Sequence, residues 1–138
     1  MDEKTYLDVN VFVYWLGGHP TFGPRALKWI GEAEEAPGQF VTSALTIYEV
    51  LVIIGGLTGR TLKDSGFVEE ALNALMGVRG LQVEPLTAAC YTEALELMDM
   101  YGLDYEDALH LAVAVQVKAQ RIVSNDGDYD RAALRRVF

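Results

Sequence analysis

The feature that most constrains the fold is an alternation of short apolar segments with longer helical ones. The short segments are rich in β-branched residues and predict strands at residues 5–8, 39–42, 81–84 and 121–124, with a terminal strand around 136–138. Helical patterns predict helices at 11–16, 24–35, 44–54, 61–76, 87–101 and 105–119. Strands that alternate with helices form parallel sheets covered by helices on both faces. The pattern therefore predicts an α/β fold.

Local signals set several of the expected helix boundaries. Ser43 is suited to cap the helix that follows it, and Asp104 is suited to cap the helix that begins at Tyr105. Gly55 and Gly56 are expected to end the apolar helix that starts after Ser43. No internal repeat or low-complexity linker divides the 138 residues, so we expect a single domain over 1–138.

Composition excludes several classes of protein. The hydrophobic fraction of 51% is too high for intrinsic disorder, and no apolar run reaches the length of about 18 residues that a membrane span requires. The opening MDEKTYLD has no apolar core of a signal peptide, which leads us to expect a cytoplasmic protein. A single cysteine, Cys90, excludes a disulfide framework and any multi-cysteine metal site.

The net charge argues at first against a nucleic-acid substrate. Twenty acidic residues against 11 basic ones give a net charge of −9, whereas proteins that bind phosphate backbones are usually basic. That objection assumes that the carboxylates are spread over the surface. The positions of the acids along the chain therefore decide its weight.

Four acids fall near strand ends or in apolar helices that begin near them. Asp8 and Asp126 each follow a predicted strand, Glu49 lies inside the apolar ALTIYEVLVII segment, and Asp107 begins another apolar helix. Ligands of α/β folds bind beyond the carboxyl ends of the strands. We therefore expect these four carboxylates to cluster at one edge of the sheet, where they cannot all remain ionised without cations.

Each acid also has a purely structural interpretation. Asp8 suits a helix N-cap, and Glu49 could reach solvent at the edge of its helix. Asp104 and Asp107 have the spacing of a capping box, and Asp126 could belong to a solvated turn. The sequence alone leaves these alternatives open, and only the joint placement of the acids favours a metal site.

Other chemistries find little support in the sequence. The D-x-D-x-D run from Asp126 is not a calcium loop of the EF-hand type, because Arg131 replaces the glycine and Val137 the glutamate that such a loop requires. His110 on a buried helix is more typical of a hydrogen-bonded core residue than of a ligand. Oxygen-only ligands select Mg²⁺ or Mn²⁺, and these ions promote hydrolysis or transfer at phosphorus.

Four segments together resemble the PIN-domain nucleases, a family that includes the VapC toxins of toxin–antitoxin pairs. YLDVNVFVYWL resembles the opening strand of the family with its D-x-N signature, and TSALTIYEVL resembles the segment with the second acid. LDYEDALHLAVA resembles the D-A-L helix start, and IVSNDGDYDR resembles the S/T-N-D loop. The resemblance covers essentially the whole chain and implies a three-layer α/β/α sandwich with a central parallel sheet.

The resemblance also implies residue roles. The metal-binding and catalytic acids would be Asp8, Glu49, Asp107 and Asp126. The supporting residues would be Asn10, Ser43 or Thr42, Asp104, Ser124 and Asp128, with Asp104 at a position that varies in the family. Candidate contacts for RNA or a protein partner are Arg25, Lys28, Arg60 and Lys63, and the C-terminal Arg131, Arg135 and Arg136 are another candidate phosphate contact. Solvated surface charge is the alternative interpretation for all of them.

The implied activity is that of a Mg²⁺- or Mn²⁺-dependent ribonuclease that acts as a homodimer and is held inactive by a small antitoxin. One alternative is a non-catalytic binding module on the same fold. Another is a haloacid-dehalogenase-like phosphatase, which is disfavoured because Asn10 stands where that family has a second acid. If the four acids bind metal, a net charge of only −5 remains elsewhere, and RNA binding should depend on metal and on salt.

Overall fold

A central sheet of five parallel strands organises the protein. The computed structural model describes residues 3–138. Its strands are β1 (Thr5–Leu7), β2 (Phe40–Ser43), β3 (Gln82–Glu84), β4 (Arg121–Val123) and β5 (Arg135–Val137). They lie in the order β3-β2-β1-β4-β5, and all four neighbouring pairs are parallel. β1 therefore lies at the centre, between β2 and β4.

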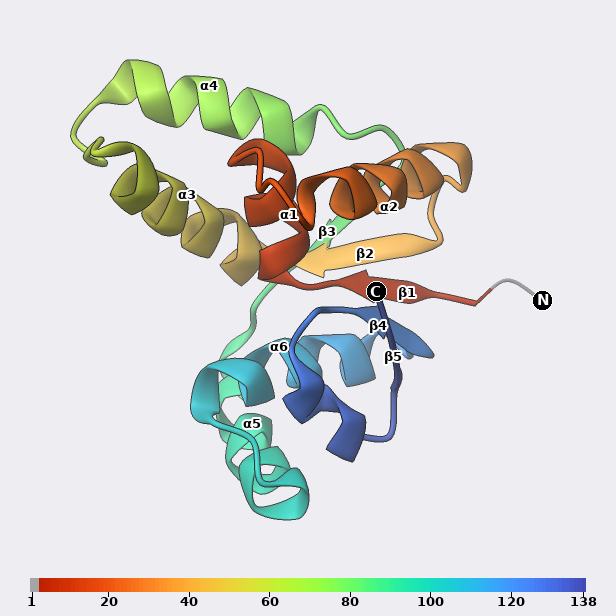
Figure 1. Ribbon diagram of the computed structural model, residues 1–138. Coiled ribbons are helices and arrows are strands. Elements are labelled where there is room, and N and C mark those ends of the chain that lie inside the picture. The colour runs from red at the N-terminus through yellow and green to blue at the C-terminus, as the bar shows by residue number, and fades with distance from the viewer. Residues whose placement is uncertain (1–2) are drawn as a thin grey trace.

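Helices cover both faces of this sheet. They are α1 (Val9–Leu16), α2 (Gly23–Glu35), α3 (Ala44–Thr58), α4 (Ser65–Met76), α5 (Ala88–Tyr101) and α6 (Tyr105–Gln116), with a short 3₁₀ helix, η1 (Gly127–Arg131). Figure 1 shows α1 to α4 on one side of the sheet and α5 and α6 on the other. The expected three-layer α/β/α sandwich with a central parallel sheet is thus confirmed.

Alternation along the central strands divides the core into two halves. Successive side chains of a strand point to opposite faces. Leu7 of β1 and Val123 of β4 pack with the α1–α4 layer, whereas Tyr6 and Ile122 pack with α5 and α6. All four are fully buried. These short strands therefore contribute to both halves of the core, which is why they are apolar on both faces.

The end of α3 differs from the sequence-based prediction. The helix does not end at Gly55 and Gly56 but continues to Thr58 and is capped by Gly59, which has a left-handed φ of 69°. Gly55 is buried at the contact with α4, where an added Cβ would lie 3.5 Å from Phe67 and 3.0 Å from the carbonyl oxygen of Arg60. The prediction was wrong because this glycine serves helix packing and not helix termination.

Three other boundaries shift by a few residues. α1 begins at Val9 instead of residue 11. α4 begins at Ser65 because Asp64 caps it, accepting a hydrogen bond from the Phe67 amide. α6 ends at Gln116 instead of residue 119. Within residues 3–138, no helix is both long and apolar enough to cross a membrane.

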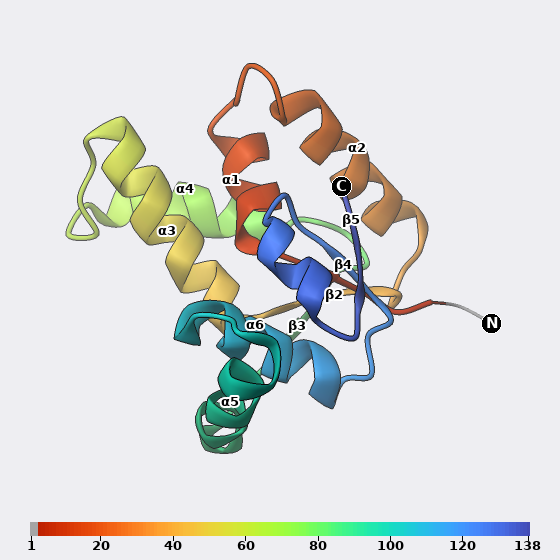
Figure 2. The same ribbon diagram turned by 60° about the horizontal axis from the view of Figure 1, so that its bottom comes forward.

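The carboxyl ends of the central strands lie at one edge of the sheet and lead into the candidate site. β1 continues into Asp8, and β4 continues through Ser124 into η1. The amide of Asp8 donates to the carbonyl of Val123, which fixes the end of β1 against the end of β4. Figure 2 shows that α6, η1 and the start of α3 lie at the same edge of the sheet as these strand ends. The topology therefore brings segments distant in sequence to one place.

Candidate metal centre

Asp8 occupies the N-cap position of α1, but its side chain does not cap the helix. Its carboxylate makes no capping hydrogen bond, and it accepts one of 2.7 Å from the hydroxyl of Ser124 instead. The residue is only 6% exposed. A buried carboxylate that is not used to satisfy the helix end is available to a ligand. The structural interpretation of Asp8 as a cap is therefore not supported.

Ser124 connects Asp8 with the loop that follows β4. Its hydroxyl, which donates to Asp8, also accepts from the amide of Asp126 at 3.0 Å and from the side chain of Asn10 at 3.4 Å. The side-chain oxygen of Asn10 in turn accepts from the amide of Asn125 at 3.4 Å. These contacts fix the β1–α1 junction against the β4–η1 loop, although Asp8 and Ser124 are 116 residues apart in the sequence.

Asp107, Asp126 and Asp128 form the first group of neighbouring acids. Each offers a carboxylate oxygen, and these oxygens lie within 4.8 Å of one another. The Asp126 carboxylate accepts from the amide of Asp128 at 2.9 Å and so shapes the start of η1. The buried hydroxyl of Tyr129 donates to the carbonyl and the carboxylate of Asp107, at 3.3 and 3.4 Å. Residues of α6 and η1 are thereby held together at the strand ends.

The aspartates repel one another electrostatically. Burial and the charges of Asp126, Asp104 and Asp8 raise the pKa of Asp107 to about 7. The pKa of Asp8 is also raised, mainly by burial, although His110 and the hydrogen bond from Ser124 oppose that shift. Carboxylates that are held close together and kept partly protonated are the arrangement that a bound cation relieves.

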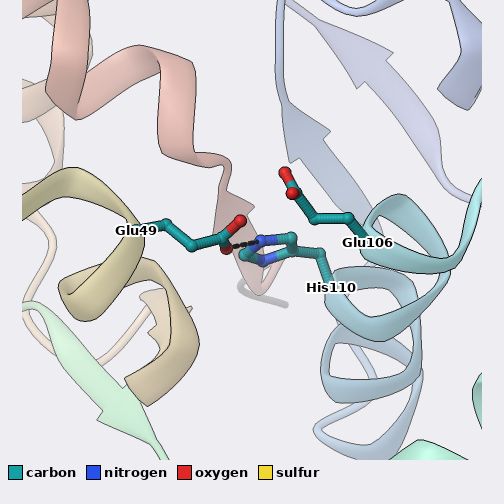
Figure 3. A group of neighbouring side chains, drawn as sticks. All are labelled: Glu49, Glu106 and His110. Carbon is teal, nitrogen blue, oxygen red and sulfur yellow. Dashed lines mark hydrogen bonds and ion pairs between the residues drawn. The ribbon is translucent and has the colours of Figure 1, made fainter. Parts of the chain in front are cut away.

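Glu49 belongs to a second group, with Glu106 and His110. Figure 3 shows Glu49 reaching from α3 to the imidazole of His110, with Glu106 one turn away on α6. Nε2 of His110 lies 2.5 Å from Oε1 of Glu49, and candidate ligand atoms of the three residues lie within 4.8 Å of one another. The structure thus divides the expected acids: Asp107 and Asp126 lie in the first group and Glu49 in the second. Asp8 belongs to neither group and is connected to the Asp126 loop through Ser124.

Electrostatic interactions connect the second group with Asp8. The hydrogen bond with Glu49, followed by burial and the charge of Glu49, raises the pKa of Glu106 to about 7. Burial lowers the pKa of His110, but its hydrogen bond to Glu49 and the charges of Asp8 and Glu49 outweigh that effect and raise it. His110 therefore interacts with the acids of its own group and also with Asp8.

His110 is a hydrogen-bonded core residue, as its position in the sequence indicated. Its side chain is 1% exposed, and its other ring nitrogen, Nδ1, is hydrogen-bonded at 2.7 Å to the hydroxyl of Tyr6. Tyr6 lies on β1 and is fully buried in the half of the core that α6 covers. Both ring nitrogens are therefore occupied by protein partners.

The remaining candidate supporting residues have local structural roles. Ser43 accepts from the amide of Leu45 and caps α3, and Thr42 donates to the carbonyl of Leu7 between β2 and β1. Asp104 caps α6 by accepting from the amide of Asp107 at 2.8 Å. Asp128 belongs to the first acidic group and also forms a 2.8 Å ion pair with Arg131.

The C-terminal arginines, expected as candidate phosphate contacts, are paired with the protein itself. Arg136 holds Asp130 and also donates to the carbonyl of Ser124 at 3.1 Å. Arg135 pairs with Glu3, and Arg131 donates to the carbonyl of Gly102 in addition to its ion pair with Asp128. Arg136 and Arg131 thus brace the loop that carries the acids.

Sequence reasoning missed Glu106 and Tyr6 as residues of the site. One signal for Glu106 was present, because it precedes His110 by four residues and therefore shares its helix face. No local signal marked Tyr6, whose contact with His110 joins residues 104 apart in sequence.

The donor set fits a hard divalent cation. Asp8, Asp107 and Asp126 offer oxygen atoms only, and carboxylate oxygens are the ligands that Mg²⁺ and Mn²⁺ prefer. Burial and the charges of neighbouring acids raise the pKa of Asp8 and of Asp107, so these two carboxylates lack sufficient positive charge around them. A surface hollow of about 220 Å³, lined by Tyr48, Val52 and Ile53 with Glu49 and Glu106, opens beside the second group.

Comparisons with known proteins show the family and the fold of this chain. The PIN-domain family matches residues 5–134. VapC20 of Mycobacterium tuberculosis, described as a toxin that cleaves the sarcin-ricin loop, superposes with a TM-score of 0.75 at 17% identity, covering 95% of this chain and 96% of that one.

Two structures of toxin–antitoxin systems are also similar in fold. A toxin–antitoxin complex from Klebsiella pneumoniae gives a TM-score of 0.65 at 18% identity and covers 98% of this chain and 97% of that one. VapBC2 of Rickettsia felis, bound to promoter DNA, gives 0.63 at 20% identity with 96% of each chain covered. Among curated protein sequences, none matches this chain significantly.

Proposed function

Because the chain belongs to the PIN-domain family, whose members are generally nucleases, we propose that it is a metal-dependent ribonuclease that hydrolyses RNA phosphodiester bonds. The observation that carries the proposal is the state of Asp8 and Asp107. Both carboxylates have raised pKa values, and Asp8 is buried without capping its helix. A cation-binding role explains why the fold places uncompensated acids together.

In this proposal Asp8, Asp107 and Asp126 hold Mg²⁺ or Mn²⁺, and Glu49 completes the acid set from the adjacent group. When bound, such an ion supplies Lewis-acid chemistry, which offsets charge on phosphoryl oxygens and lowers the pKa of water. Ser124 and Asn10 orient Asp8 and the Asp126 loop through their hydrogen bonds. The protein residues thus keep the ligand oxygens in place before RNA binds.

We further propose that the protein is the toxin of a VapBC-type pair and acts as a homodimer in the cytoplasm. The similar structures of toxin–antitoxin complexes support a small protein partner. A hollow of about 360 Å³ between α3 and α4, lined by apolar side chains together with Arg60 and Glu70, is the candidate contact for an antitoxin segment.

The test is RNA cleavage by the purified protein. We expect cleavage in Mg²⁺ or Mn²⁺ and none in EDTA. In Asp107→Asn the rate of cleavage should fall at least about 100-fold, because that variant loses a carboxylate proposed to bind the cation. Circular dichroism would show that the variant is folded. Equal cleavage by the wild type and by Asp107→Asn, or cleavage that persists in EDTA, would reject the proposal.

The two alternatives raised by the sequence fit the structure less well. A non-catalytic binding module has no need for a set of partly buried, mutually repelling acids. A haloacid-dehalogenase-like phosphatase needs a second acid at residue 10, where Asn10 is instead engaged with Ser124 and Asn125. Calorimetric titration with Mg²⁺ and a search for an acid-labile phosphoenzyme would distinguish these functions from a ribonuclease.

A further inference from the structure

Glu49 lies on a helix that gives its carboxylate little polar support of its own. α3 is apolar along most of its length, with Val50, Leu51 and Ile54 buried. The side chain of Glu49 is only 13% exposed. Its carboxylate is hydrogen-bonded to His110 of α6, on the other side of the sheet edge. The orientation of Glu49 is therefore set from outside its own helix.

The contact that orients it runs through three secondary-structure elements. Tyr6 of β1 holds Nδ1 of His110 at 2.7 Å, and Nε2 of the same ring lies 2.5 Å from Oε1 of Glu49. Tyr6 and His110 are 0% and 1% exposed. The rings of Tyr6 and His110 also meet edge to face, with centroids 5.9 Å apart. The imidazole is thus fixed on both sides before it reaches Glu49.

This arrangement does not depend on the charge of the ring. A carboxylate only accepts hydrogen bonds, so Nε2 carries the proton and donates to Glu49 whether the imidazole is neutral or charged. Nδ1 is hydrogen-bonded to Tyr6 in either case. The geometry of the contact is the same in both states.

We propose that His110, held by Tyr6, is a positioning residue that fixes the Glu49 carboxylate in the orientation it needs to join the acids that bind metal. The inference rests on the proposed function and extends it to residues that do not themselves touch metal or RNA. Groups that orient metal-binding side chains typically contribute 10- to 100-fold to metal affinity or activity. Without His110, Glu49 would be free to turn into the hollow formed with Tyr48, Val52 and Ile53.

Two substitutions at the same buried position separate the two contacts of the ring. In His110→Gln the side-chain amide lies near the former Nε2 and can still donate to Glu49. In His110→Asn the amide lies near Nδ1 and reaches Tyr6 but not Glu49. Both introduce an amide into the same space, so a general loss of packing affects them alike.

The primary measurement is Mn²⁺ affinity by isothermal titration calorimetry on the full chain. We expect His110→Asn to bind Mn²⁺ about 10-fold more weakly than the wild type, and His110→Gln to stay within about 3-fold. Val113→Ala opens a cavity on the same buried helix without touching Glu49, and it should leave the affinity unchanged. Equal losses in His110→Asn and His110→Gln, or a loss in Val113→Ala, would overturn the proposal.

A double-mutant cycle tests whether His110 acts through Glu49. In a Glu49→Ala background, His110→Asn should change Mn²⁺ affinity less than 2-fold, because the residue it positions is already absent. A full additional 10-fold loss would overturn the proposal. If His110→Asn does not fold, Tyr6→Phe replaces it in the cycle. That variant removes only the hydroxyl that holds Nδ1, and it should weaken Mn²⁺ binding in the wild-type background only.

RNA cleavage separates failure of the inference from failure of the proposed function. The expected result is a lower kcat in His110→Asn with an unchanged KM for RNA, and recovery of kcat in His110→Gln. If the Mn²⁺ affinities of the wild type and the variants follow the expected pattern but the wild type cleaves no RNA, the positioning role stands and the ribonuclease proposal fails. If His110→Asn cleaves and binds Mn²⁺ like the wild type, the positioning role is rejected and the ribonuclease stands. No Mn²⁺ binding by the wild type would reject both.

Discussion

At the scale of single residues, the site is built from carboxylates that the fold holds in unfavourable surroundings. Asp8 is buried beside Ser124, and Asp107 faces Asp126 and Asp104. In the absence of a cation, such acids destabilise the folded chain once they ionise. The chain therefore carries a cost in stability at the residues that prepare it to bind metal, and this cost can be measured.

The metal-free protein should lose stability as the pH rises, and Asp107 should account for part of that loss. Its pKa is about 7 in the folded protein against a usual 3.8. The folded state therefore holds a proton that the unfolded state has already released, and stability falls between about pH 4 and pH 7. Asp107→Asn cannot ionise, so it should unfold at a higher temperature than the wild type at pH 8 in EDTA.

Thermal unfolding at pH 5 and pH 8, followed by circular dichroism, checks this expectation. The difference between wild type and Asp107→Asn should be larger at pH 8, because the wild-type carboxylate is ionised there and still protonated at pH 5. Adding Mg²⁺ should raise the unfolding temperature of the wild type more than that of the variant. A variant that is less stable than the wild type at pH 8 in EDTA would contradict the account.

At the scale of secondary-structure elements, the sequence predicted the order and type of the strands and helices well. The apolar β-branched segments and the capping residues Ser43 and Asp104 were sufficient for that. The end of α3 was wrong because Gly55 looks like a helix stop but fills a close contact with α4. The grouping of Glu49 with His110 was not predictable, because it depends on how α3 and α6 meet across the sheet edge.

Gly56 in the last turns of α3 and Gly59 at its C-cap offer a matched pair of substitutions. Gly56 lies within the helix, and a Cβ added there meets nothing within 4 Å, so Gly56→Ala should stabilise the protein by about 0.5–1 kcal/mol. Gly59 has a φ of 69°, so Gly59→Ala should destabilise it by about 1 kcal/mol. Urea denaturation measures both effects. Changes of the same sign in the two variants would show that the end of the helix is assigned wrongly.

At the scale of the whole molecule, the net charge of −9 no longer argues against an RNA substrate. Four of the excess negative charges belong to Asp8, Glu49, Asp107 and Asp126, which the fold brings to one edge of the sheet. The part of the surface that would repel a phosphate most strongly is therefore also the part that attracts a divalent cation. The rest of the chain carries a net charge of −5, which any RNA contact must still overcome.

RNA binding should accordingly require metal and weaken steeply with salt. A Glu49→Gln variant, chosen to slow cleavage, should bind a short single-stranded RNA much more tightly in Mg²⁺ than in EDTA at the same ionic strength, because the cation offsets the aspartates that face the phosphate. Raising KCl from 50 to about 200 mM should weaken binding in Mg²⁺, because binding releases counterions from the RNA and added salt opposes that release. Fluorescence anisotropy measures both effects. Binding that is as tight in EDTA as in Mg²⁺ would mean that RNA docks away from the acids, on a surface that their charge does not reach.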